Sequence, residues 1–147
     1  MRRSSCTGRI HRLLPIVVLL SIAGVPACSD KHSVYPVRGR VVDVENKPAA
    51  GAMLIFHPSA PDPKDSSKPV ATVDEDGNFT LTTYKAGDGA PAGEYVITIT
   101  WPGKKKSPFD RPEPDKLKGR YADPATSALR YTVENNPGNE VSTIVLK

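Results

Sequence analysis

The stretch Glu94-Tyr-Val-Ile-Thr-Ile-Thr-Trp101 decides the fold class of this chain. Its apolar side chains recur at every second position, so an extended backbone places Tyr95, Ile97, Ile99 and Trp101 on one face. A period of two, built from β-branched and aromatic residues, is typical of a strand that buries one face against a core. We therefore expect residues 94–101 to form a strand of an all-β domain.

Six further segments share this character, and short turns separate most of them. They span residues 34–44, 52–57, 70–73, 78–84, 129–133 and 141–146. Seven short strands without a long amphipathic helix predict an all-β fold, a seven-stranded Greek-key β-sandwich. Large apolar side chains from both sheets are expected to form its core.

Two connections between these segments carry specific predictions. Asp74-Glu-Asp-Gly77 lies between two apolar runs, and it predicts a hairpin turn in which Gly77 adopts a positive φ. Residues 102–127 form a long loop with four prolines between positions 102 and 114. Leu117 and Tyr121 lie four residues apart in this loop, which predicts a short helical turn docked on the sandwich.

The N-terminal residues have the layout of a secretory signal peptide. Arg2, Arg3, Arg9 and Arg12 precede an apolar stretch over residues 13–25. This stretch is shorter than the roughly 20 apolar residues that a bilayer-spanning helix needs, and it has the length of a signal-peptide core. The protein is therefore expected to be exported and to be preceded by a cleaved signal.

Cys28 ends this segment and is the predicted lipidation site of a bacterial lipoprotein. A lipoprotein signal has a branched apolar residue three positions before the cysteine and a small residue directly before it, which Val25 and Ala27 provide. Cleavage between Ala27 and Cys28 leaves a signal peptide (1–27), a lipidated tether (28–33) and a sandwich domain (34–147). The alternatives are an ordinary secretory signal that is cut near Ala27 and leaves Cys28 as a free thiol, and a signal that stays uncleaved as an anchor.

Removal of this signal changes the net charge and the cysteine count of the protein. The full chain has a formal net charge of +4, but residues 28–147 hold 16 basic and 16 acidic residues. The basic character therefore belongs to the signal, and nucleic acid is not an expected partner. Cys6 leaves with the signal, so Cys28 has no partner for an internal disulfide. Because Ser29 rather than Asp follows Cys28, we expect the cell envelope as location and favour the outer membrane over the inner one.

The succession of motifs between residues 35 and 101 resembles the carboxypeptidase regulatory-like, or transthyretin-like (prealbumin-like), domains of small envelope lipoproteins. The resemblance rests on Tyr35-Pro-Val-Arg-Gly-Arg-Val-Val, Pro48-Ala-Ala-Gly-Ala52, Phe56-His-Pro58, Asp76-Gly-Asn-Phe79 and Pro91-Ala-Gly-Glu-Tyr95. It extends over most of residues 34–147. It implies a seven-stranded sandwich of transthyretin-like or immunoglobulin-like type that acts as a secreted, non-catalytic accessory or binding module.

One enzyme class belongs to the same family, the hydroxyisourate hydrolases. Those enzymes use histidines, an arginine and a C-terminal Tyr-Arg-Gly-Ser-type ending, whereas this chain ends Thr143-Ile-Val-Leu-Lys147 and has three histidines in all. We find no nucleophile with an accompanying base either. The chain is therefore expected not to be an enzyme, and the hydrolase is the less favoured hypothesis.

Ligand-binding candidates lie at the end of the strand over 94–101 and in the loop after it. Trp101 would stack on a sugar, and Lys104, Lys105 and Lys106 open a basic loop (104–120) that would contact anionic headgroups or an acidic glycan. The alternatives are a tryptophan packed at the rim of the core and a solvated loop. The partners expected for the domain are the membrane, through the lipid, and an envelope glycan or another envelope protein.

No metal or cofactor is expected. Asp74, Glu75, Asp76 and Asn78 gather oxygen ligands of the kind that calcium takes, but the spacing of an EF-hand loop is missing. A zinc site needs three or four ligands brought together, and the histidine in a predicted strand, His57, has no evident partners. The acidic tetrad is expected to be the solvated tip of a hairpin.

Overall fold

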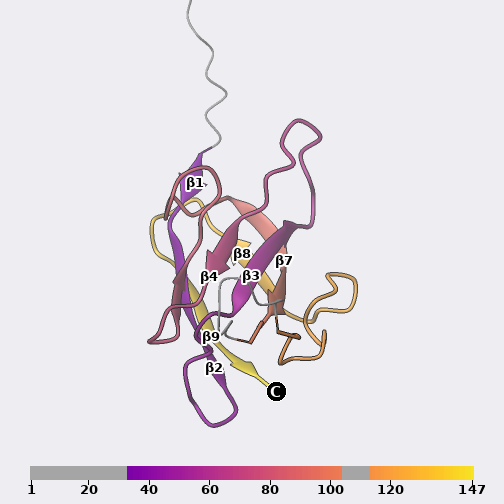
Figure 1. Ribbon diagram of the computed structural model, residues 1–147. Coiled ribbons are helices and arrows are strands. Elements are labelled where there is room, and N and C mark those ends of the chain that lie inside the picture. Colours follow the sequence, from indigo (N-terminus) through magenta and orange to yellow (C-terminus); the bar gives the residue numbers. More distant parts are fainter. Residues whose placement is uncertain (1–32, 104–112) are drawn as a thin grey trace, which may run out of the picture. The chain divides into compact units, whose positions relative to one another are not determined.

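The computed structural model of the chain describes residues 33–103 and 113–147, and these residues form an all-β fold (Figure 1). Seven strands make two sheets that pack face to face, as predicted for a β-sandwich. The first sheet has the order β5 (Asn78–Thr80), β2 (Val37–Asp43), β9 (Asn139–Leu146). The second has the order β4 (Val70–Thr72), β3 (Met53–Pro58), β7 (Gly93–Thr100), β8 (Arg130–Val133). A short pair, β1 (Val34–Tyr35) and β6 (Ala90–Pro91), lies beside them.

The core lies between the inner faces of the two sheets. Tyr95, Ile97 and Ile99 of β7 are buried, as the alternation predicts, and Trp101 packs against the core with part of its surface exposed. The ring of Phe56 in β3 faces that of Phe79 in β5, with 6.5 Å between ring centroids, and so joins the two sheets. Each fully buried large apolar side chain contributes about 1.5–3 kcal/mol to the free energy of unfolding, so this core can hold the domain without a disulfide.

Gly39 of β2 is required by this packing. It points toward the core between its buried neighbours Val37 and Val41, directly under the Phe79 ring. A Cβ atom at this position would lie 2.7 Å from two carbons of that ring and 2.9 Å from the Cβ of Val141. Only glycine leaves room for the ring to lie against the backbone of β2.

Strand β9 pairs parallel with β2, and its register shifts by one residue along the pair. Gly39 lies opposite Val141, but Val41 lies opposite Ile144, so β9 carries one more residue than β2 over this span. The extra residue is a β-bulge, and it leaves two successive residues, Ser142 and Thr143, exposed to solvent. The buried positions thereby change from odd to even numbers, and Ile144 and Leu146 still reach the core.

The predicted hairpin at Asp74–Gly77 is confirmed in part: the turn forms and is closed by Asp74 N–H donating to Asn78 O, and Val70 pairs antiparallel with Thr82. Gly77 has a φ of +88°, as predicted. However, β4 pairs with β3 and β5 pairs with β2, so the turn carries the chain from one sheet to the other. Further backbone bonds tie each side of the turn to a different sheet, because Gly51 N–H donates to Val73 O on one side and Val41 N–H to Gly77 O on the other. Connections of this kind, from one sheet to the other, occur in Greek-key sandwiches.

The described part of the long loop, residues 113–127, folds back onto the sandwich. Leu117 and Tyr121 both pack against the core, as predicted. The backbone between them makes successive tight turns instead of the predicted helical turn, because Lys118 and Gly119 have φ values of +50° and +76°. Left-handed residues interrupt a right-handed helix. No helix within the described ranges is long and apolar enough to cross a membrane.

Candidate functional site

The residues that the sequence predicts as sites divide into two groups. Ala27, Cys28 and Lys104–Lys106 lie outside the described residues, so the predicted lipidation and the lysines of the basic loop stay predictions. Trp101 and the end of the basic loop, from residue 113 onward, are described.

Trp101 is held by contacts with residues distant from it in the chain. Its indole N–H donates to Ala50 O at 3.0 Å, and its backbone N–H donates to the carboxylate of Asp115 at 2.7 Å. The ammonium of Lys116 lies 4.4 Å from the ring centroid, at the distance of a cation–π contact. The basic loop therefore meets Trp101 at Lys116, while the polar edge of the indole is already satisfied.

Asp115 organises this region through its carboxylate. The carboxylate accepts backbone N–H groups from Trp101, from Leu117 at 3.1 Å and from Gly119 at 2.9 Å. Burial opposes the charge of Asp115, but these three hydrogen bonds outweigh it and lower the pKa of the carboxyl below its usual value. Asp115 thus acts as a turn-forming anion whose acceptor oxygens are occupied by backbone.

The acidic tetrad and His57 are likewise engaged in local structure. Asp74 Oδ1 accepts the N–H groups of Asp76 at 3.0 Å and Asn78 at 2.8 Å, which is the geometry of an Asx turn. His57 Nε2 lies 2.9 Å from the hydroxyl of Thr98, and burial together with nearby Lys68 lowers the pKa of its imidazole. In the part of the chain that the structure describes, no three His, Cys, Asp or Glu side chains form a set that could hold a metal ion.

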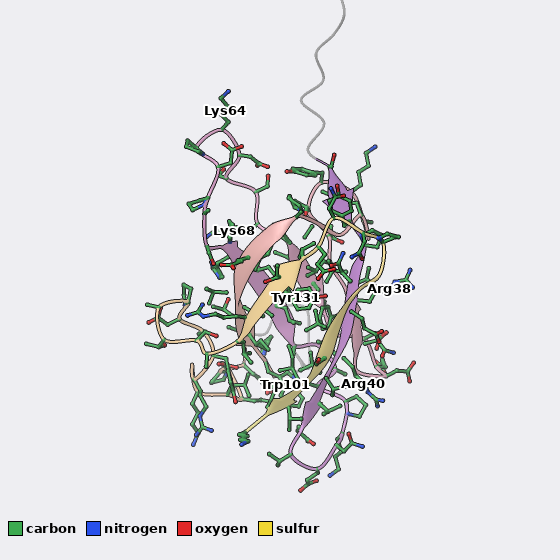
Figure 2. All side chains as sticks on the ribbon, turned by 180° about the vertical axis from the view of Figure 1, so that it is seen from behind. Arg38, Arg40, Lys64, Lys68, Trp101 and Tyr131 are labelled. Atoms are coloured by element: carbon green, nitrogen blue, oxygen red, sulfur yellow. The ribbon has the colours of Figure 1, made fainter. Side chains whose placement is uncertain are left out.

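A groove of about 600 Å³ lies on the outer face of the three-stranded sheet, away from the core. Arg38 and Arg40 of β2 flank it, and we call it the two-arginine groove. Figure 2 shows both side chains leaving β2 toward the outside of the molecule. Polar side chains of the neighbouring strands complete its lining: Asn78 and Thr80 from β5, and Glu140, Ser142 and Thr143 from β9.

The strand register arranges these side chains in two rows. Arg38 lies opposite Thr80 on one side and Glu140 on the other. Arg40 lies opposite Asn78 on one side, and on the other it meets the bulge. The bulge therefore places two hydroxyl side chains, instead of one, beside Arg40.

Both arginines are exposed to solvent. Within residues 33–103 and 113–147, neither guanidinium makes an ion pair or a side-chain hydrogen bond, although Glu140 lies on the adjacent strand. An arginine that is held on a rigid strand with its donors unused can bind an incoming carboxylate or phosphate in a bidentate manner.

Sequence reasoning places Arg38 and Arg40 on the solvent face of their strand but assigns them no role. The alternation in Val37–Val41 shows which way they point. It does not show that β5 and β9 flank β2, since β9 lies about a hundred residues away in the chain. The signal that could have found the site is a pair of arginines at i and i+2 in a strand without an acidic residue at either neighbouring position.

Comparisons with known proteins gave two structural likenesses. No family model and no curated protein matches the sequence. A 9R-lipoxygenase from Cyanothece PCC8801 is similar over 77% of this chain and 16% of its own, at 14% identity and a TM-score of 0.39. The major pilin subunit of Bacillus cereus is similar over 76% of this chain and 29% of its own, at 13% identity and a TM-score of 0.41. This chain thus spans less than a third of either protein, and the likeness concerns the fold alone.

Proposed function

We propose that this protein is an envelope lipoprotein that is anchored to the membrane through Cys28 and acts as a non-catalytic binding module. The observation that carries the proposal is the order of features along the chain. A basic segment and an apolar stretch end at Val25-Pro-Ala-Cys28, and five polar or small residues then lead to β1. A short tether of this kind would hold the sandwich close to the membrane surface.

The transthyretin-like resemblance is part of this proposal. Its motif Pro91-Ala-Gly-Glu-Tyr95 lies where β7 begins, and the Tyr95 hydroxyl donates to Pro91 O at 2.8 Å. A tyrosine near the start of a strand that bonds back to the backbone a few residues upstream is a feature of Greek-key sandwiches. Its motif Asp76-Gly-Asn-Phe79 forms the turn between the sheets and supplies the Phe79 ring to the core. These placements support the family assignment.

The binding role is supported by the two-arginine groove. It holds two exposed guanidinium groups that form no ion pair within the described residues, on the face of a sheet. The location follows from the anchor. Ser29 after Cys28 favours the outer membrane, with the domain in the periplasm or at the cell surface.

The anchor is tested by exchanging the two cysteines separately. We expect Cys28→Ser to abolish acyl labelling and detergent-phase partitioning, because it removes the predicted acceptor thiol. Cys6→Ser is the matched control, since it removes a thiol from the predicted signal and should leave labelling unchanged. Acyl chain on the Cys28→Ser protein, or a wild-type protein that is exported without acyl chain, would contradict the proposal.

A second candidate is a carbohydrate-binding or peptidoglycan-binding module that uses Trp101 and the basic loop 104–120. It is favoured by the position of Lys116, whose ammonium lies over the Trp101 ring. Binding of purified protein to envelope glycans tests it against a Trp101→Ala variant. Trp101→Phe serves as control, because it keeps an aromatic face and loses the indole N–H. Undiminished affinity of Trp101→Ala would remove Trp101 from the site.

A further inference from the structure

We infer that the two-arginine groove binds an acidic polysaccharide of the cell envelope, with Arg38 and Arg40 holding its carboxylates. This inference rests on the proposed role as an envelope binding module, and it names the ligand class and the site. It differs from the second candidate above, because the groove lies on the outer face of the other sheet from the one that ends at Trp101.

The spacing of the two arginines suits a ligand with repeated charges. Side chains at i and i+2 of a strand point the same way and lie about 6.5–7 Å apart along it. Arg38 and Arg40 have this relationship on β2, which is the central strand of its sheet. A ligand that lies along β2 can therefore meet both guanidinium groups. The planar fork of each guanidinium group matches the two oxygens of one carboxylate.

The remaining lining suits hydroxyl-rich chains. Thr80, Asn78, Ser142 and Thr143 offer hydroxyl and amide groups, which both donate and accept hydrogen bonds. The bulge in β9 doubles the number of hydroxyls beside Arg40, and bulges commonly redirect side chains next to binding sites. The hydroxyl groups that lie between the carboxylates of an acidic polysaccharide need partners of this kind.

The same lining argues against a lipid surface as the occupant. Phe79 and Val141 also border the groove, but their side chains are buried in the core, so they contribute backbone. Surfaces that lie on membranes combine basic residues with apolar side chains that enter the bilayer boundary. The side chains that face this groove are polar.

Glu140 provides a test of whether the ligand is negatively or positively charged. It lies opposite Arg38 and is the acidic residue among those that line the groove. A carboxylate ligand would be repelled by it, so Glu140→Gln should strengthen binding while loss of either arginine weakens it. A site for a cationic ligand would show the opposite pattern.

The experiment is calorimetric titration of the full-length lipidated protein in detergent with polygalacturonate, with neutral dextran and with polyphosphate. We expect polygalacturonate to bind and dextran not to bind. Arg38→Gln and Arg40→Gln should each lower the affinity about tenfold, the size expected for losing one charge-assisted hydrogen-bonding group. Glu140→Gln should raise the affinity a few-fold. Arg130→Gln on the outer face of β8 removes the same charge elsewhere and should have no effect.

Several results would overturn the inference. These are equal affinity of the arginine variants and the wild type, equal binding of dextran, absent binding of polygalacturonate, or tighter arginine-dependent binding of polyphosphate. Unchanged melting temperatures of the variants show that binding, not folding, was altered. Failure here leaves the anchor untouched, since acyl labelling of Cys28 is measured separately, so the two proposals fail independently.

Discussion

The Asp115 carboxylate accepts the backbone N–H of Trp101 at 2.7 Å, across fourteen residues of chain. A return bond runs from Lys116 N–H to Trp101 O at 2.9 Å. One side chain therefore fixes the points at which the long loop leaves the sandwich and comes back to it. It also sets the position of Lys116 over the indole ring. Asp115 is therefore a main contributor to the order of this region, together with the backbone bond from Lys116.

We expect Asp115→Asn to lower the free energy of unfolding by about 1–2 kcal/mol, the range measured for capping side chains that bond backbone N–H groups. The amide keeps one acceptor oxygen but turns the other into a donor, which faces the N–H of Gly119 or of Trp101. Urea unfolding at pH 7 measures the change. Asp76→Asn is the matched control, because the Asp76 carboxylate accepts none of these loop hydrogen bonds and its change should be within about 0.5 kcal/mol.

The pH dependence of stability should also report the role of the Asp115 carboxylate. Because the pKa of Asp115 is lowered in the folded state, its contribution is fully present above the unfolded value of about 4 and is lost as the pH falls through the folded pKa. The pKa of Asp88 is also lowered, because burial raises it but backbone hydrogen bonds from Thr83, Lys85 and Tyr84 outweigh that effect. The contribution of Asp88 to the pH dependence of stability remains in the variant. Asp115→Asn should therefore reduce, and not abolish, acid destabilisation. An unchanged acid profile would contradict this assignment.

The contact between Gly39 and Phe79 predicts a steric penalty. Gly39→Ala places a methyl group 2.7 Å from the Phe79 ring, so we expect a loss of about 1–3 kcal/mol in the free energy of unfolding. Phe79→Leu in the same chain should recover part of it, because the smaller side chain vacates that space. Gly138→Ala is the control, since its nearest neighbour would be at 3.5 Å. Strictly additive effects of Gly39→Ala and Phe79→Leu would show that the contact does not decide the cost.

The bulge in β9 predicts that two single-residue deletions differ. Deleting Thr143 leaves a regular strand in which Val141, Ile144 and Leu146 still face the core, so the domain should fold with a modest change in stability. Deleting Val145 turns Leu146 outward and should cost about 1.5–3 kcal/mol from that side chain alone. Thermal unfolding compares the two proteins. Equal stabilities would mean that the alternation around the bulge does not govern burial.

Tyr95 predicts alkaline destabilisation. Burial, helped by the charge of Asp65, raises the pKa of Tyr95 to about 12 in the folded state. The stability that its neutral hydroxyl contributes is present below about pH 10 and is lost as the pH rises through the folded value. Tyr95→Phe should cost about 1 kcal/mol at pH 7, from the lost bond to Pro91 O, and should flatten the loss above pH 10. Tyr131→Phe removes a hydroxyl that makes no such bond within residues 33–103 and 113–147, so it should change neutral stability little. A Tyr95→Phe protein that unfolds in alkali like the wild type would refute this.

The sequence by itself determined those features that depend only on residues close together in the chain. The alternation in 94–101 predicted β7 and its buried face, because a side chain on an extended backbone is turned by about 180° at each step. Gly77 predicted the turn at Asp74–Gly77, because a positive φ is sterically costly for other residues. Leu117 and Tyr121 were expected against the core because they lie four residues apart, and both reach it, although through tight turns and not through the helical turn that this spacing predicted. The lipidation motif around Cys28 is local in the same sense.

Only the tertiary structure decided which strands lie side by side. Nothing within 70–84 tells that its two strands enter different sheets, because that depends on backbone bonds from Gly51 and Val41. The parallel pairing of β2 with β9, the bulge at Ser142 and Thr143, and hence the two-arginine groove follow from contacts between the two ends of the domain. Local sterics and burial set the period of each strand. The neighbour of each strand is set by the free energy of the whole packed core, which no single segment contains.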